Sequence, residues 1–257
     1  MLFDTHVHLN SEEYKNVNEV IERARENGVT KMVVVGYDLE SSIKAVEIAS
    51  NFDFIYASIG IHPSEAKKAK ISDFEAIEAM MNNEKVVAVG EIGLDYHWDS
   101  DNKEQQKDFF VRQLKLASKH KKPVVIHSRD AAQDTYDILK ENKFMYEKGI
   151  MHCYSYSKEM AELFVGLGLS LAFGGALTFT NAKENKLVVE NTSIKNLLLE
   201  TDAPYLTPHP FRGKLNEPKY IYLVAEKIAE IKKIKKEEVE RITYENACNL
   251  FGIEKWK

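Results

Sequence analysis

The chain has 257 residues, of which 44% are hydrophobic and 29% are charged. This balance is typical of globular proteins and excludes a mainly disordered or fibrous chain. The formal net charge of −5 excludes a broadly basic surface for nonspecific nucleic-acid binding, but not a small local one. No apolar run reaches the about 18 residues of a membrane-spanning helix, and the N-terminus lacks the basic and then apolar pattern of a signal peptide. We therefore expect a cytoplasmic protein that does not enter a membrane.

Short apolar runs rich in Val, Ile and Leu recur along the whole chain. They occupy residues 2–5, 32–35, 54–59, 86–89, 123–126, 149–151, 169–173 and 197–199. Consecutive runs begin roughly one βα unit apart, which is about 30 residues. The stretches between them carry apolar residues at helical spacing, as in Val17, Val20, Ile21 and Ala24. Apolar strands that alternate with one-sided helices predict a parallel sheet covered by helices.

Eight such units predict a single α/β domain over residues 1–257, a (β/α)8 TIM barrel, because this fold typically takes about 250 residues. The alternative is an open doubly wound sheet. That fold normally has a glycine-rich phosphate loop after its first strand, where this chain has Thr5-His6-Val7-His8. After the last apolar run, a loop with several prolines over residues 204–218 precedes two predicted helices, at about 219–232 and 236–250.

Chemically active side chains follow most of the predicted strands. The active site of such a barrel forms at the C-terminal ends of its strands. The residues at those ends are His6 and His8 after the first strand, His62 after the third, Glu91 after the fourth, His127 after the fifth, His152 after the sixth and Asp202 after the eighth. The two cysteines are far apart in the sequence, so a metal at this end would be bound by histidine and carboxylate.

The spacing of His6 and His8 indicates a shared ion, because residues two apart on a strand point the same way. Four histidines and two carboxylates exceed the three protein ligands of a typical mononuclear catalytic zinc site. We therefore predict two adjacent divalent cations. A carboxylate has two oxygens with which to bridge them, and Glu91, from the middle strand of the set, is the candidate bridge.

Six segments of the chain together resemble the TatD family of metal-dependent hydrolases, within the amidohydrolase-like barrels. The segments are residues 3–9, 60–63, 89–96, 123–131, 149–155 and 199–206, and the resemblance runs from residue 1 to about residue 252. It implies that one ion is held by His6, His8 and Asp202, and the second by His127 and His152, with Glu91 linking both. It also implies a cytoplasmic DNase with 3′-to-5′ exonuclease action on single-stranded DNA.

The predicted reaction is phosphoester hydrolysis by two metal ions, with Glu91 and Asp202 as catalytic residues. Asp202 would orient the attacking water and accept its proton. Candidate substrate-binding residues are His62, Arg129 and Arg212, each weighed against a structural or solvated role. The identity of the ions stays open among zinc, manganese, iron, cobalt, nickel and magnesium. We expect a monomer.

Two alternative hypotheses remain. The same ligand set suits cleavage of a C–N or carboxyl ester bond, since a fold does not decide the substrate. A non-catalytic module could instead keep the metals for stability or for binding a partner. Asp202 disfavours that second hypothesis, because a purely structural site needs no carboxylate placed to take a proton.

Overall fold

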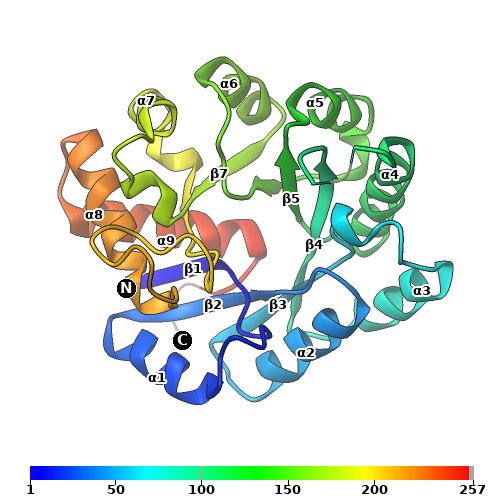
Figure 1. Cartoon of the computed structure of the whole chain (residues 1–257), viewed down its shortest axis with the longest axis horizontal. Helices are drawn as coiled ribbons and strands as arrows, with labels where there is room; N and C mark the ends of the chain where they lie inside the picture. Colours follow the sequence, from blue (N-terminus) through cyan, green and yellow to red (C-terminus); the bar gives the residue numbers. More distant parts are fainter. Residues whose placement is uncertain (99, 255–257) are drawn as a thin grey trace.

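The computed structural model describes residues 1–98 and 100–254, and within them the chain forms a ring of parallel strands surrounded by helices (Figure 1). Eight strands lie in chain order in one sheet, each paired in parallel with the next. They are β1 (Leu2–Val7), β2 (Val29–Val35), β3 (Ile55–Ile59), β4 (Val86–Asp95), β5 (Val124–Arg129), β6 (Gly149–Met151), β7 (Leu169–Phe173) and β8 (Leu197–Leu199). The predicted (β/α)8 barrel is confirmed, and the open doubly wound sheet is wrong.

Helices follow the strands and cover the outside of the ring (Figure 1). The α-helices are α1 (Val17–Glu26), α2 (Leu39–Ser50), α3 (Ile71–Met80), α4 (Lys103–His120), α5 (Ala132–Glu141), α6 (Lys158–Gly166), α7 (Lys183–Asn191), α8 (Ile221–Lys232) and α9 (Lys236–Phe251). Short 3-10 turns lie at Pro63–Glu65, Lys143–Met145, Gly175–Thr178, Ile194–Asn196 and Pro218–Tyr220. In the described part of the chain, no helix is long and apolar enough to cross a membrane.

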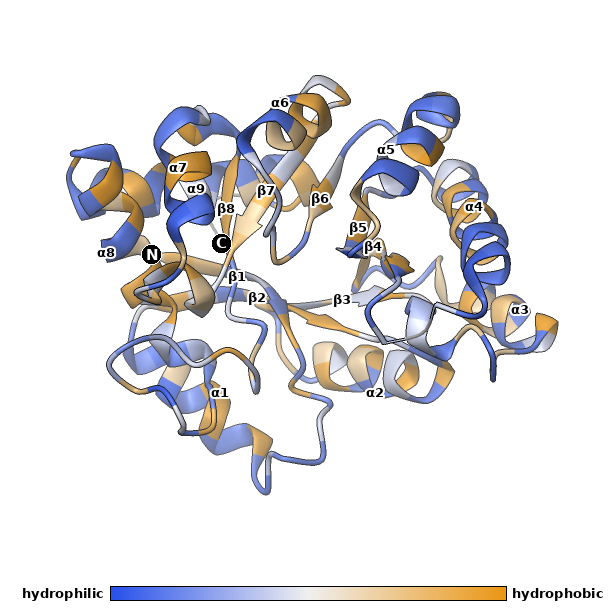
Figure 2. Cartoon of the chain, turned by 45° about the horizontal axis from the view of Figure 1, so that its top comes forward, coloured by the Kyte–Doolittle hydropathy of each residue, from blue (hydrophilic) through white to orange (hydrophobic). Residues whose placement is uncertain are grey.

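The helices form where apolar spacing and a capping residue coincide. Helix α1 begins after Asn16, whose side chain accepts from the backbone N–H of Glu19, and it buries Val20, Ile21 and Ala24 against the strands. Figure 2 shows this mixture of hydrophobic and hydrophilic residues on the helices, whereas β7 and β8 are mostly hydrophobic. Both faces of those strands are covered, as a parallel sheet requires.

Three strands extend beyond the C-terminal ends of the apolar runs that predicted them. The predicted runs 2–5, 86–89 and 123–126 end before the observed strands do, so His6, Glu91 and His127 lie within strands rather than after them. The backbone continues to pair although the side chains become polar, and β4 pairs with β5 as far as Asp95 with Arg129. Apolar content therefore stops predicting a strand where the strand begins to carry polar site residues.

The sheet closes between β8 and β1 through one parallel bridge, Val7 with Ala203. The backbone N–H of His8 donates to Ala203 O at 2.8 Å, and that of Asp202 donates to His6 O at 3.0 Å. The start of the chain is thereby joined to residues about two hundred positions later.

Inward-facing apolar residues fill the barrel, and α9 covers its other end. The filling residues include Phe3, Val33, Val125, Ile150 and Leu198. Phe3 packs against two aromatic rings of α9, Tyr244 at 6.1 Å and Phe251 at 5.8 Å between ring centroids. The side-chain alternation of a strand places the residues two positions after Val125, Ile150 and Leu198 on the same inward side, closer to the open mouth.

We predict that Phe3→Ala lowers the free energy of unfolding by about 3–5 kcal/mol, because it leaves a cavity in a fully buried cluster. Denaturant unfolding followed by circular dichroism measures this change. The matched control is Phe144→Ala, since that ring is 78% exposed and its loss should change the unfolding free energy by less than about 0.5 kcal/mol. Equal effects of the two substitutions would contradict the packing described for Phe3.

Candidate metal centre

The six predicted metal ligands converge at the C-terminal mouth of the barrel. His6 lies in β1, Glu91 in β4 and His127 in β5, while the other three follow strand ends: His8 after β1, His152 after β6 and Asp202 after β8. All are buried or half-buried. Their ligand atoms form overlapping groups within 4.8 Å of one another.

The first group joins the residues of β1 to Glu91 and Asp202. His6 Nε2 lies 3.2 Å from His8 Nε2, 3.4 Å from Glu91 Oε2 and 3.8 Å from Asp202 Oδ1. His8 Nε2 lies 3.9 Å from Glu91 Oε2 and 3.4 Å from Asp202 Oδ1. Ligand atoms placed tetrahedrally about one ion at about 2.0–2.1 Å are separated by about 3.4 Å. These four atoms therefore fit the coordination of one divalent cation.

The second group uses the other oxygen of Glu91. Oε1 lies 3.0 Å from His127 Nδ1 and 3.7 Å from His152 Nε2. Oε2 of the same carboxylate faces His6 and His8. Glu91 thus presents one oxygen to each group, as a carboxylate shared between two cations would.

Hydrogen bonds on the far side of three of the four candidate ligand rings, those of His8, His127 and His152, fix which nitrogen faces the centre. His8 Nδ1 lies 3.0 Å from Val35 O, and His152 Nδ1 lies 2.9 Å from Glu200 Oε2. A carbonyl or a carboxylate can only accept, so Nδ1 carries a proton and Nε2 is the nitrogen that would bind a cation in the centre. His127 is turned the other way, because its Nε2 is held by Asp95 Oδ2 at 2.9 Å and its Nδ1 faces Glu91. Such outer hydrogen bonds are typical of metal-binding histidines.

The two carboxylates of the centre are held ionised by the imidazoles. Burial alone would raise the pKa of Glu91, but His62, His152 and His6 keep that pKa well below its usual value. Burial likewise opposes ionisation of Asp202, and His152 and His8 keep its pKa low. Buried negative charge beside nitrogen lone pairs is an arrangement that a cation stabilises.

His62 lies beside the second group but presents a proton rather than a lone pair. Its Nδ1 accepts from the backbone N–H of Ser64 at 3.1 Å, which leaves the ring proton on Nε2. That nitrogen lies 3.6 Å from Glu91 Oε1. Burial and the neighbouring His127 lower the pKa of His62 to about 3, so the ring stays neutral. His62 is therefore a hydrogen-bond donor at the centre and not a fifth nitrogen ligand.

The two predicted arginines lie outside the ligand cluster. Arg129 ends β5 and is exposed, with its guanidinium 5.3 Å from the ring centroid of Trp98. Arg212 is exposed in the loop after β8, with its guanidinium 4.0 Å from the ring centroid of Phe179. Within the described part of the chain, neither arginine pairs with a carboxylate.

Sequence reasoning missed the acids that support the ligands. Glu200 is fully buried and accepts from Cys153 N at 2.8 Å as well as from His152. Asp95 ends β4 and holds His127. Strand alternation offered a signal for Glu200, which stands two residues after the inward-facing Leu198.

Asp4 joins the two ends of the chain beneath the centre. Its Oδ1 accepts from the backbone N–H of Thr201 at 2.9 Å and from that of His6 at 3.3 Å, and its Oδ2 accepts from the Thr201 hydroxyl at 2.5 Å. Burial raises the pKa of Asp4 to about 8, against the opposing hydrogen bond from Thr201. This carboxyl group fixes β1 relative to the segment that carries Asp202.

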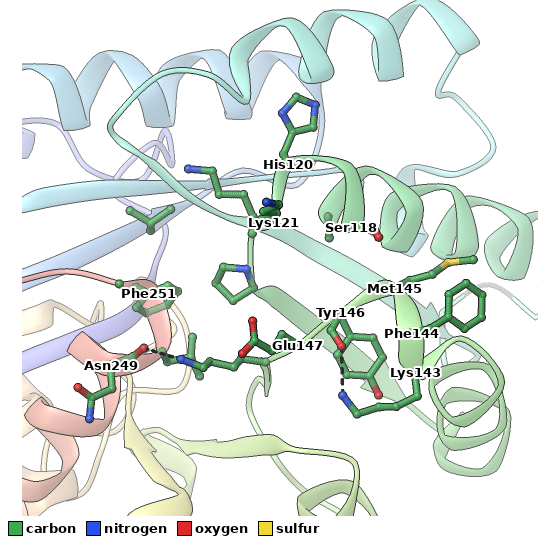
Figure 3. A pocket seen from close by; sticks show the side chains of 17 residues that line it. Ser118, His120, Lys121, Lys143, Phe144, Met145, Tyr146, Glu147, Asn249 and Phe251 are labelled. Carbon is green, nitrogen blue, oxygen red and sulfur yellow. Dashed lines mark hydrogen bonds between the residues drawn. The ribbon is translucent and has the colours of Figure 1, made fainter.

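A depression of about 670 Å³ lies at the opposite end of the barrel and contains none of the six candidate ligands (Figure 3). Three of its lysines donate to main-chain carbonyls: Lys122 Nζ to Val86 O at 2.6 Å, Lys143 Nζ to Tyr146 O at 3.1 Å and Lys148 Nζ to Asn249 O at 3.2 Å. These contacts satisfy main-chain carbonyl groups, which gives these three lysines a structural role.

We predict that Glu200→Gln weakens divalent-cation binding by about 10- to 100-fold, because the amide cannot hold His152 in its metal-binding tautomer as the carboxylate does. Competition with a chromogenic chelator measures the affinity, and circular dichroism checks the fold. Glu162→Gln on the exposed surface of α6 is the matched control. Unchanged affinity in the Glu200 variant would contradict the role given to this hydrogen bond.

Comparison with known proteins places this chain among proteins of one family. The family model described as "TatD related DNase" matches residues 3–252. The uncharacterized metal-dependent hydrolase YabD of Bacillus subtilis is 49% identical over 254 residues, covering 98% of this chain and 100% of that protein. The uncharacterized metal-dependent hydrolase YcfH of Escherichia coli K12 is 34% identical over 257 residues, covering 98% of this chain and 96% of that protein.

A solved structure agrees with these matches. The crystal structure of YJJV, a TatD homologue from Escherichia coli K12, superimposes with a TM-score of 0.94 at 31% sequence identity and covers 98% of each chain. The resemblance drawn from the six sequence segments is thereby confirmed. The chain belongs to the family of TatD-related DNases and is a metal-dependent hydrolase.

Proposed function

We propose that this hydrolase cleaves phosphoester bonds with a binuclear metal centre, as a deoxyribonuclease that removes nucleotides from single-stranded DNA in the 3′-to-5′ direction. The observation that carries the proposal is the shared carboxylate. Glu91 turns Oε2 to His6 and His8 and Oε1 to His127 and His152. A pair of ions held in this way faces a phosphate group better than a single ion does, since a phosphate offers two oxygens.

The donor set divides between two ions. His6, His8 and Asp202 with Glu91 Oε2 would hold one, and His127 and His152 with Glu91 Oε1 would hold the other. Paired divalent ions supply Lewis acidity toward a phosphate and make water a stronger acid. Histidine-rich ligation favours zinc, manganese, iron, cobalt or nickel over magnesium.

Asp202 is the candidate proton acceptor. Its side chain is 14% exposed, and Oδ1 is 3.4 Å from His8 Nε2 and 3.8 Å from His152 Nε2. The neighbouring imidazoles keep the carboxylate ionised at neutral pH. An ionised carboxylate at the mouth can orient a water molecule and take its proton.

Positive and proton-donating groups at the mouth suit an anionic substrate. The Nε2–H of His62 points into the centre and would donate to a phosphate oxygen in place of Glu91. Arg129 is exposed at the end of β5 and Arg212 in the loop after β8, where a guanidinium can bind a phosphate with two parallel hydrogen bonds. These local charges suit a strand of DNA although the whole chain carries a net charge of −5.

The direct test is a time course on single-stranded oligonucleotides labelled at either end. We expect a 5′-labelled strand to shorten one nucleotide at a time, a 3′-labelled strand to release labelled mononucleotide at once, and a chelator to stop both reactions. Cleavage of simple amides or carboxyl esters, with no cleavage of any phosphoester, would support the alternative hydrolase. Metal-loaded protein that is inert toward all of these substrates would support a non-catalytic module.

A second prediction separates His62 from the ligands. We expect His62→Ala to lower kcat/KM on a phosphodiester by about 10- to 100-fold, which is the range expected for one hydrogen bond to a charged group. Metal content should stay normal, because the Nε2 of this ring carries a proton. Elemental analysis and steady-state kinetics on the same preparation measure both quantities. Loss of one ion from the variant would show that His62 is a ligand instead.

A further inference from the structure

We propose that Trp98 and Arg129 form a subsite for one unpaired nucleobase and its phosphate, at the rim of the metal centre. The inference rests on the proposed function and deepens it, because it names the feature by which the site would prefer single strands.

The indole of Trp98 offers an open aromatic face to solvent. The residue is 73% exposed in the turn that follows β4. One face of the ring is covered by the guanidinium of Arg129, 5.3 Å from the ring centroid, and an edge meets His97 at 4.9 Å between centroids. Because the residue is 73% exposed although one face of its ring is covered, the other face is free for a stacked base.

The same turn is tied directly to the metal centre. The backbone N–H groups of His97 and Trp98 donate to Asp95 Oδ1 at 2.9 and 3.1 Å. The other oxygen of Asp95 holds Nε2 of His127 at 2.9 Å. One carboxylate therefore fixes both the turn that carries the indole and a candidate metal ligand.

The backbone of Arg129 is held by the end of β4 and by the turn that follows it. It pairs with Asp95 in the β4–β5 register, and Tyr96 N donates to Arg129 O at 2.9 Å. The neighbouring acid, Asp130, is engaged by His97 Nδ1 at 2.9 Å. Among the described residues no carboxylate pairs with the Arg129 guanidinium, so its planar fork is available to a phosphate.

Three other aromatic side chains of the mouth loops already have partners. Tyr154 is buried, and Phe211 stacks on Tyr220 with ring centroids 4.7 Å apart. Tyr96 donates its hydroxyl to Asp134 at 2.7 Å. Among the described residues of the mouth loops, Trp98 is the most exposed aromatic side chain. Because stacking requires a base that is not paired, the subsite would favour single strands over duplex.

The test measures binding of a fluorescently labelled oligothymidylate to the full-length chain by anisotropy, at low salt and with excess chelator so that nothing is cleaved. The second probe is an abasic strand of the same length and charge. We expect Trp98→Leu to weaken oligothymidylate binding by about tenfold and to leave abasic-strand binding unchanged. Trp98→Phe should keep most of the affinity, because it retains a ring. Arg129→Ala should weaken both probes, because it removes a charge.

Phe144→Leu is the matched control, since Phe144 is a 78% exposed aromatic residue outside the metal centre and should not affect either probe. Equal oligothymidylate affinity of the unmodified chain and Trp98→Leu would overturn the proposal, as would equal losses for both probes. The same measurements, combined with a cleavage assay, distinguish failure of the subsite from failure of the proposed nuclease function. Trp98-dependent binding by a protein that cleaves no phosphoester would refute the nuclease alone, and cleavage with Trp98-independent binding would refute the subsite alone.

Discussion

Closure of the sheet between β8 and β1 is the constraint on which the metal centre depends. The closing hydrogen bonds join the backbone of His6 and His8 to that of Asp202 and Ala203, so the same contacts complete the barrel and bring together ligands from both ends of the chain. Asp4 in β1 strengthens the same closure by accepting hydrogen bonds from the backbone N–H and the hydroxyl of Thr201. Because the site is assembled by the fold itself, loss of the closure would disperse the ligands.

Within this barrel, far-side hydrogen bonds distinguish His8, His127 and His152 from His62 by role. Val35, Glu200 and Asp95 each hold a ring proton on the side away from the centre, which leaves lone pairs for cations. Ser64 does the opposite for His62 and leaves a proton facing the centre. The chemical difference between a ligand and a donor is therefore set by residues that never touch the centre.

The sequence was sufficient for the architecture and for the convergence of the six candidate ligands at the mouth, because both depend on regular spacing. Apolar runs at βα intervals predict the barrel, and β6, β7 and β8 have the predicted bounds. The strands β1, β4 and β5 were underestimated because their inward side becomes polar at His6, Glu91 and His127. Strand alternation places Glu200 on the inward side, but the roles of Glu200 and Asp95 depend on hydrogen bonds to rings 48 and 32 residues away, which alternation does not identify.

The central claim is that these imidazoles and carboxylates hold two cations in one cluster. It is tested most directly by stripping the full-length protein of metal, titrating it with zinc or manganese, and counting tightly bound ions by mass spectrometry under native conditions. The account predicts two ions per chain at saturation. A protein that saturates at one ion, or that takes up none, would contradict it.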